Sequence, residues 1–217
     1  MQLEPIILYG KHIRLEPLSL DHLTGLCEVG LEPDIWRWAP KPISTSEERR
    51  TYVETALRWQ AEGAALPFAT ILNETNRIVG STRFANIDRE HKHMEIGWTW
   101  IGPAWQRTAV NTEAKYLMLR HAFEKLGCIR VEFKTDSLNQ QSRSAILRIG
   151  AKEEGTFRNH MSTQDGRYRH SVYFSVIDSE WPEVKRKLEE TGTQIAHRLT
   201  KLESGVEPPP SRSIIAG

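Results

Sequence analysis

The sequence Pro103-Ala-Trp-Gln-Arg-Thr-Ala-Val-Asn-Thr-Glu-Ala-Lys115 joins two segments of different periodicity. The preceding segment, Met94-Glu-Ile-Gly-Trp-Thr-Trp-Ile101, alternates as a β-strand does, and the following one, Glu113 to Leu126, has apolar residues at helical spacing. The order predicts a strand, a short turn and a helix. The first N–H groups of such a helix have no partners within it, and with the helix dipole they favour a bound anion such as a phosphate. The alternative is an ordinary turn that binds nothing.

Within this stretch, Gln106-Arg-Thr-Ala-Val-Asn-Thr-Glu-Ala114 resembles the acetyl-CoA pyrophosphate loop of the GNAT superfamily of N-acetyltransferases. The nearest branch is RimJ/RimL-like, in which the loop usually reads Gln-Gly-x-Gly-x-Ala-Thr-Glu-Ala. The chain departs at Arg107 and Ala109, where Gly is usual, and at Asn111, where Ala is usual. Because Gly lets backbone approach a ligand closely, Ala109 narrows the clearance but still offers its N–H. Arg107 adds a cation near the phosphates or is a solvated loop charge.

Length and composition limit the class of protein. The chain has 217 residues, with 29 Lys+Arg against 28 Asp+Glu, so one domain with a full core is expected. The balanced charge argues against a nucleic-acid-binding protein. No apolar run has the length of a membrane span, and the first residues lack the basic start of a signal peptide. The two cysteines form no metal-binding pattern, so we expect a cytoplasmic protein without a metal.

The rest of the pattern predicts the order β-α-α-β-β-β-α-β-α-β-β. This order resembles the GNAT acyl-CoA N-acyltransferase fold, an α/β (α+β mixed) architecture with a twisted mixed β-sheet flanked by helices on both faces. The resemblance covers about residues 8 to 190. We therefore expect a GNAT domain over 1–192. The pattern weakens after this, and the Pro-rich residues 193–217 are expected to form an extended or mobile C-terminal extension.

The resemblance implies that acetyl-CoA binds as a co-substrate, with its pantetheine arm along the strand before the turn and near an Asn that begins the next helix. As an amide, Asn139 can both donate and accept hydrogen bonds, and it also suits the N-cap of that helix. The implied coenzyme contacts are Trp98, Thr99, Trp100, Ile101, Gln106, Arg107, Thr108, Ala109, Val110, Asn111, Thr112, Asn139 and Ser142.

Two carboxylates are candidates for the catalytic base. Acetyl transfer requires the acceptor ammonium to lose a proton, and in the GNAT fold the acetyl group lies where two central strands separate. Glu95 is on the first of these strands and Glu132 on the second. A desolvated carboxylate could act as the base, with Glu95 slightly preferred. The alternative for each is an ion pair with Arg130 or Lys134, and a water relay would make neither essential.

A proton donor for the thiolate is less evident. Many GNAT enzymes have a Tyr seven residues after the Asn, but this chain has Ile146 there. The RimL-type arrangement suggests the hydroxyl of Ser142 instead.

The acceptor site is expected to include Trp36 and Trp38, which lie in a Pro-flanked loop, and His160 and His170 on the last hairpin. The alternative for the last two, which is the commoner case, is that they are exposed hairpin histidines.

The leading interpretation is an acetyl-CoA-dependent N-acetyltransferase that acts on a primary amine by direct attack in a ternary complex. The acceptor could be a protein N-terminus, a free amino acid, a polyamine or an aminoglycoside-like amine, and the fold does not decide among them. One alternative is a non-catalytic acyl-CoA-binding or sensing module, and another is an interaction protein with a degenerate site. We expect no nucleic-acid or membrane partner, and a homodimer stays open.

Overall fold

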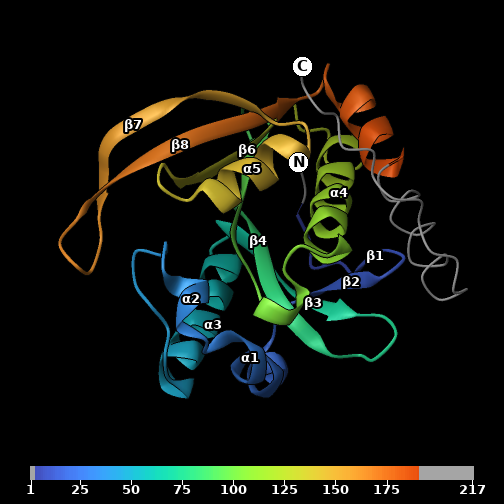
Figure 1. Ribbon diagram of the computed structural model, residues 1–217. Coiled ribbons are helices and arrows are strands. Elements are labelled where there is room, and N and C mark those ends of the chain that lie inside the picture. Colours follow the sequence, from blue (N-terminus) through green and yellow to red (C-terminus); the bar gives the residue numbers. More distant parts are fainter. Residues whose placement is uncertain (1–2, 191–217) are drawn as a thin grey trace, which may run out of the picture.

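The computed structural model describes residues 3–190, which contain one mixed eight-stranded sheet with helices on both faces (Figure 1). The strand order is β1-β2-β3-β4-β5-β6-β8-β7. The strands are β1 (Leu8–Tyr9), β2 (Ile13–Pro17), β3 (Ala65–Leu72), β4 (Ile78–Asp88), β5 (His93–Ile101), β6 (Arg130–Asp136), β7 (Lys152–Ser162) and β8 (Tyr168–Ile177). The helices are η1 (Leu20–His22), α1 (Leu23–Gly30), α2 (Pro33–Trp36), α3 (Ser46–Ala61), η2 (Pro103–Trp105), α4 (Ala109–Glu124) and α5 (Gln140–Arg148), followed by an unlabelled helix whose described part is 181–190.

The parallel contact between β5 and β6 is short. It comprises three residue pairs, from His93–Arg130 to Glu95–Glu132, whereas the other neighbouring strands are antiparallel. Beyond Glu95 the two strands separate, although β5 continues to Ile101 and β6 to Asp136. The separation leaves part of the β5 edge without a strand partner. An extended ligand can bind at such an edge as an added strand.

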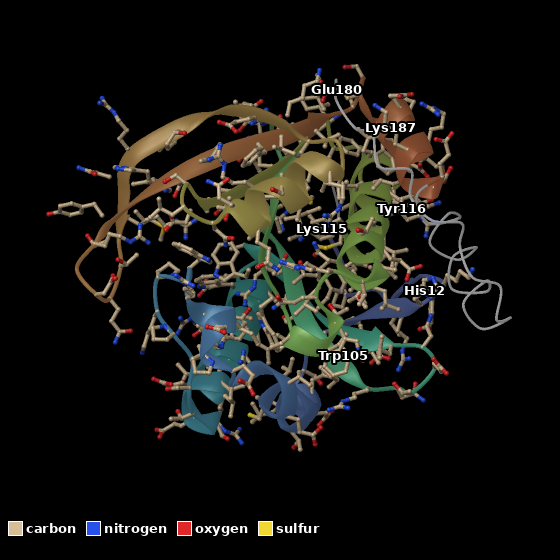
Figure 2. The ribbon with its side chains drawn as sticks, viewed as in Figure 1. His12, Trp105, Lys115, Tyr116, Glu180 and Lys187 are labelled. Atoms are coloured by element: carbon tan, nitrogen blue, oxygen red, sulfur yellow. The ribbon has the colours of Figure 1, made fainter. Side chains whose placement is uncertain are left out.

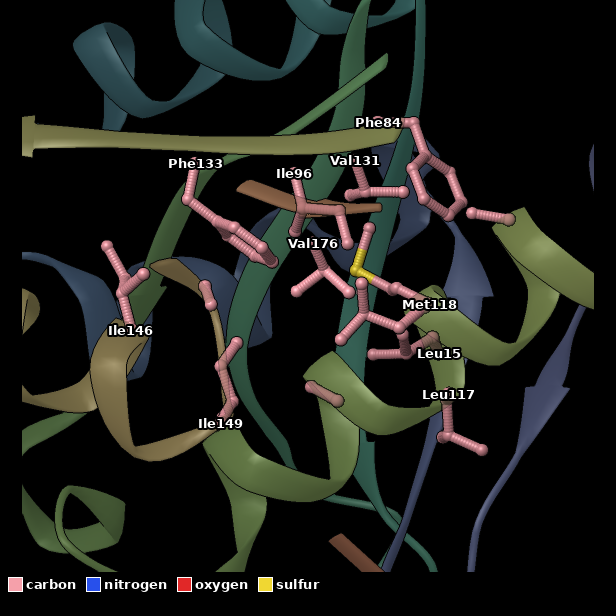
Figure 3. Close-up of a cluster of buried hydrophobic side chains, with 14 of the residues drawn as sticks. Leu15, Phe84, Ile96, Leu117, Met118, Val131, Phe133, Ile146, Ile149 and Val176 are labelled. Carbon is pink, nitrogen blue, oxygen red and sulfur yellow. The ribbon is translucent and has the colours of Figure 1, made fainter. Parts of the chain in front are cut away.

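Two apolar clusters fix the layers. Helices α4 and α5 pack on one face of the sheet, where Phe133 of β6 shares a cluster with Ile146 of α5 and with Ile149, the C-cap of that helix (Figure 3). Helices α1 and α3 pack on the other face, where Val53 of α3 and Trp100 of β5 belong to a second cluster. We call the side of the sheet covered by α4 and α5 the α4 face, and the side covered by α1 and α3 the α3 face. Each strand residue near the separation can be assigned to a face by the helix that it contacts.

The predicted fold class and element order are confirmed, with local corrections. Helix α4 begins at Ala109 rather than Glu113, because Thr108 takes extended backbone angles and caps it. The Pro-flanked Trp loop contains a helical turn, α2, with Pro33 in its first turn. The last helix starts at residue 181, after a turn that includes Ser179. The predicted extension, 193–217, lies outside the described residues. Among residues 3–190, no helix is both long and apolar enough to cross a membrane.

Candidate active site

The N-terminus of α4 follows the turn after Ile101, at the end of the part of β5 that no longer pairs with β6. Thr108 caps the helix, and its Oγ1 accepts the N–H of Val110 over 3.3 Å. Within the described residues, no acceptor is found for the N–H groups of Arg107, Thr108, Ala109 and Asn111. These four donors are therefore available to an anion.

Some of the backbone N–H groups that were predicted to bind phosphate already have hydrogen-bond partners. The N–H of Gln106 donates to the carbonyl of Pro103 over 3.2 Å within the turn of η2. The N–H of Val110 donates to the cap oxygen of Thr108. These two amides therefore already have partners, and the predicted contact of Thr112 with the coenzyme stays a prediction. The sequence placed the helix start four residues too late, which hid this distinction.

Arg107 adopts a left-handed conformation, with φ of 62°. The sequence comparison had marked this position as one where the GNAT loop usually has Gly. Gly takes positive φ without strain, whereas a residue with a Cβ is disfavoured there. The turn has therefore kept the backbone shape that the family's Gly provides, at a conformational cost. The Arg107 side chain is exposed.

Glu113 of the same motif has a structural role. The carboxylate of Glu113 accepts the backbone N–H groups of Lys11, His12 and Ile13 at 2.6, 2.9 and 3.0 Å. Gly10 is needed there, because a Cβ at this residue would lie 2.8 Å from a carboxylate oxygen of Glu113. The Glu of the motif therefore joins α4 to the turn before β2.

The Gln106 side chain connects the end of β5 to the start of α5. Its Nε2 donates to the carbonyl of Ile101 over 3.1 Å, and its Oε1 accepts from Gln141 over 3.1 Å. These contacts tie the end of β5 to α5. Its predicted contact with the coenzyme stays a prediction.

Trp98 forms a β-bulge in the middle of β5. Its φ is 50°, and β5 has one residue more than β4 between the pairs Ser81–Trp100 and Arg83–Gly97. Bulges of this kind re-orient the backbone and occur often beside active sites. This one lies where β5 has already separated from β6, so it offers re-oriented amides to the gap.

The bulge sends neighbouring side chains to different faces. The ring of Trp98 meets that of Trp59 of α3, with centroids 5.5 Å apart, so it lies on the α3 face. The hydroxyl of Thr99 accepts a hydrogen bond from Lys115 of α4 over 2.5 Å, so it lies on the α4 face. The gap between β5 and β6 is thus lined differently on its two sides.

Both candidate bases are in ion pairs. Glu95 is almost fully buried, and its carboxylate accepts from Asn86 over 2.7 Å and from the ammonium of Lys134 over 2.9 Å. That ammonium also lies 5.5 Å from the centre of the Trp98 ring, which places Glu95 and Lys134 on the α3 face. The half-buried Glu132 pairs with Arg130 over 2.8 Å. The ion pairs weighed as alternatives are therefore present, and the catalytic roles stay predictions.

Sequence reasoning missed Arg83, a buried cation on the α3 face. Its guanidinium lies over the rings of Tyr52, Trp59 and Trp98 at 4.8, 5.5 and 5.3 Å. Its Nε and one Nη have no hydrogen-bond partner among the described residues. No local motif marks it, because the rings come from α3 and β5. It gives the bulge an aromatic and cationic support.

Asn139 acts as the N-cap of α5, and its Oδ1 accepts the N–H of Ser142 over 3.0 Å. The capping role that the sequence left open is therefore present, and a pantetheine contact stays a prediction. Ser142 is half-buried. Ile146, at the position where other GNAT enzymes carry Tyr, is buried in the core and cannot donate a proton.

The β7–β8 hairpin, which extends well beyond the rest of the sheet in Figure 1, carries the two predicted acceptor-site histidines. A broad hollow of about 870 Å³ is lined by Phe157, Arg158, Asn159, His160 and His170. Burial lowers the pKa of His160, whose Nδ1 lies 2.9 Å from the hydroxyl of Ser171. The structure brings both histidines to one hollow.

The two predicted acceptor-site tryptophans differ in exposure. Trp36 is buried, with its Nε1 donating to the carbonyl of Gly30 over 2.8 Å and its ring 5.7 Å from that of Trp100. These contacts give it a packing role, and we do not carry it into the acceptor site. Trp38 is half-buried, and the loop that holds it touches the β7–β8 turn through a 3.2 Å bond from the Gln164 N–H to the Pro40 carbonyl.

Lys115 is the second functional candidate that the sequence did not reveal. It is buried, and Figure 2 shows it inside the molecule where α4 faces α5, whereas its neighbour Tyr116 contacts Trp181 of the last helix. Its Nζ lies 2.5 Å from Oγ1 of Thr99 and 3.5 Å from Oγ1 of Thr82. Desolvation lowers the pKa of Lys115 to about 7, and the nearby charge of Glu95 acts in the opposite direction.

A helix start with unpartnered N–H groups after two separating parallel strands, one of which carries a bulge, is an arrangement suited to acyl transfer from a phosphate-bearing thioester. The family model described as acetyltransferase (GNAT) domain matches residues 12–152 of this chain. The chain therefore belongs to the GNAT family of acetyltransferases, as the sequence predicted.

Individual relatives agree with this assignment. A crystal structure from T. thermophilus, provisionally ascribed to an acetyltransferase, is 34% identical, covers 88% of this chain and 99% of its own, and has a TM-score of 0.79. YdaF of Bacillus subtilis (strain 168), provisionally ascribed a ribosomal N-acetyltransferase activity, is 26% identical over 77% of this chain and 90% of its own. RimJ of Mycobacterium smegmatis, solved with CoA-disulfide, is 19% identical, covers 86% of this chain and 91% of its own, and shares the fold with a TM-score of 0.74. These relatives support the predicted RimJ/RimL-like resemblance.

Proposed function

We propose that this protein transfers the acetyl group of acetyl-CoA to a primary amine, by direct attack of the amine within a ternary complex. The observation that carries the proposal is the gap between β5 and β6, which opens beside four unpartnered N–H groups at the start of α4. The diphosphate of the coenzyme binds those amides, mainly of Arg107, Thr108, Ala109 and Asn111. The pantetheine arm then follows the free edge of β5 from Ile101 toward Trp98.

The two faces of the gap have separate roles in this scheme. The coenzyme enters from the α4 face, and the amine approaches from the α3 face, where Glu95 lies. Glu95 removes a proton from the acceptor ammonium, either directly or through water. The amides of the bulge at Trp98 stabilise the negative charge that develops on the carbonyl oxygen. Glu132 remains the second candidate for the base.

The acceptor site extends from the gap to the hollow on the β7–β8 hairpin. The hollow is wide and carries His160 and His170, which can bind the carbonyl groups of a polypeptide. The ribosomal activity ascribed to YdaF gives further support to a protein N-terminus as the acceptor. Small amines stay in the test panel because the hollow holds no feature that excludes them.

A coenzyme-binding test uses the first residue of α4. Proline is tolerated at a first helical position but has no N–H, so Ala109→Pro removes one phosphate donor and retains the helix. We expect calorimetry to show CoA binding by the wild type and an affinity about tenfold or more lower in this variant. The matched control is Ser46→Pro, the same change at the first position of α3, which leaves the affinity unaltered. Absence of CoA binding by folded wild-type protein overturns the proposal.

A turnover assay tests whether the protein transfers the acetyl group to an amine. Wild-type protein is incubated with acetyl-CoA and a panel of peptide N-termini, amino acids, polyamines and aminoglycosides, and released thiol and product masses are measured. Turnover with at least one amine is expected. The alternative of a coenzyme-binding module without catalysis is favoured by the buried Ile146 at the usual Tyr position. It predicts tight CoA binding with no release of thiol.

A further inference from the structure

Lys115 occupies an unusual position for a charged side chain. It projects from α4 into the space between three strands, with Thr82 of β4 and Thr99 of β5 as hydrogen-bond partners and the Phe133 ring of β6 at 5.9 Å from its Nζ. It forms no ion pair within residues 3–190. A buried amine held only by two hydroxyls is expensive for the fold, so its presence calls for a functional reason.

The two strands that Lys115 joins are those that separate. Thr99 follows the bulge at Trp98 on β5, and Phe133 follows Glu132, the last residue of β6 that pairs with β5. The amine of Lys115 therefore lies at the gap and on its α4 face, opposite the face that holds Glu95.

The reaction lacks an assigned proton donor on the α4 face. Ile146 has no ionisable group, and the hydroxyl of Ser142 is a weak acid that needs help to protonate a thiolate. We propose that Lys115 is a catalytic residue that donates a proton to the CoA sulfur as the thiolate leaves, an inference that rests on the proposed acetyl transfer.

The acetyl transfer can be written as a balanced reaction with the groups already named. The amine nitrogen forms a bond to the carbonyl carbon, the carbon–sulfur bond breaks, and the electron pair of that bond stays on sulfur. Sulfur takes a proton from the Lys115 ammonium. The acceptor ammonium loses two protons, one to Glu95 or water before the attack and one to water as the amide forms. Lys115 then regains a proton from solvent when the products leave. Thr82 and Thr99 orient the amine through their hydroxyl oxygens.

The acid–base balance of Lys115 suits this task. Desolvation lowers its pKa to about 7, so both protonation states are populated near neutral pH. Among the described residues, Glu95 of β5 is the charged group that acts on it, and it favours the protonated form. An ordinary exposed lysine would hold its proton too tightly to transfer it efficiently.

The test uses CoA itself and needs no acceptor. The thiolate of CoA absorbs in the ultraviolet, so the thiol of enzyme-bound CoA can be titrated in the wild type, Lys115→Met, Ser142→Ala and the control Lys125→Met. Lys125 is exposed at the C-terminal end of the same helix. A cation beside the sulfur stabilises the thiolate, so we expect the bound thiol of the Lys115→Met protein to have a pKa higher by about one unit or more than in wild type. Lys125→Met should match wild type.

Each outcome has a distinct meaning. If wild type binds no CoA, the proposed function fails before the role of Lys115 is reached. If CoA binds but Lys115→Met leaves the thiol pKa unchanged, the inference is wrong and the proposed function stands. A shift in Ser142→Ala alone would also overturn it, in favour of Ser142. With an identified acceptor, kcat should fall by about 10²-fold or more in Lys115→Met and in Lys115→Gln, with CoA affinity retained.

Discussion

The carboxylate of Glu95 lies 2.9 Å from the ammonium of Lys134, which is on the strand that separates from its own. Both groups are on the α3 face of the gap, and Asn86 donates a further hydrogen bond to Glu95. These contacts hold the carboxylate beside the gap, because two donors compensate the loss of water.

The first prediction concerns Glu95. Changing Glu95 to Gln retains its shape and removes its capacity to accept a proton, so kcat should fall by about 10²-fold or more while CoA affinity stays the same. The matched variant Glu132→Gln, on the paired position of β6, should lose much less. Steady-state kinetics with the best amine of the panel measure both. A larger loss in Glu132→Gln would transfer the role of base to that residue.

The second prediction is a pH-dependent stability. The pKa of Lys115 is lowered from 10.5 to about 7 on folding, so between these values the unfolded chain binds more protons and wild-type stability rises with pH. Lys115→Met removes this group and should be the more stable protein at low pH. Its advantage should be largest below about pH 7 and shrink by about 1.4 kcal/mol per pH unit above that.

Urea unfolding at several pH values measures the difference. Lys125→Met serves as control because this lysine is exposed, and its difference from wild type should not vary with pH. A pH-independent difference for Lys115→Met would mean that the amine is hydrated in the folded protein.

The third prediction concerns two separate properties of Arg107, the strain of its backbone conformation and the charge of its side chain. Arg107→Gly removes the cost of a positive φ, and we expect stability to rise by about 0.5–1 kcal/mol. Arg107→Ala keeps that cost and removes only the charge. If the guanidinium attracts the coenzyme phosphates, both variants bind CoA more weakly, and the loss diminishes at high salt. Thermal unfolding and calorimetry at two salt concentrations distinguish the two effects.

The fourth prediction concerns the junction between α4 and the turn before β2. Glu113→Ala leaves three backbone N–H groups without their acceptor, so stability should fall by about 1–3 kcal/mol. Hydrogen exchange should accelerate at Lys11, His12 and Ile13. Unchanged exchange at these amides would show that water replaces the carboxylate without loss.

The residues with a local signal were predicted well. Alternation and helical spacing gave the strand and helix on either side of Pro103–Lys115, and the motif at Gln106–Ala114 indicated the family. Asn139 was correctly expected to suit an N-cap, because capping depends on residues a few positions apart. The start of α4 was misplaced because a Thr cap and a polar first turn resemble a loop in the sequence.

The chemistry at the gap was decided by the tertiary structure. The sequence determined that the chain is a GNAT acetyltransferase with carboxylates on its two central strands. It could not show that Lys115 reaches from α4 to Thr99, or that Lys134 pairs with Glu95, because these contacts join residues 16 and 39 positions apart on different elements. Burial sets the acidity of an amine, and burial exists only once the helix has packed against the sheet.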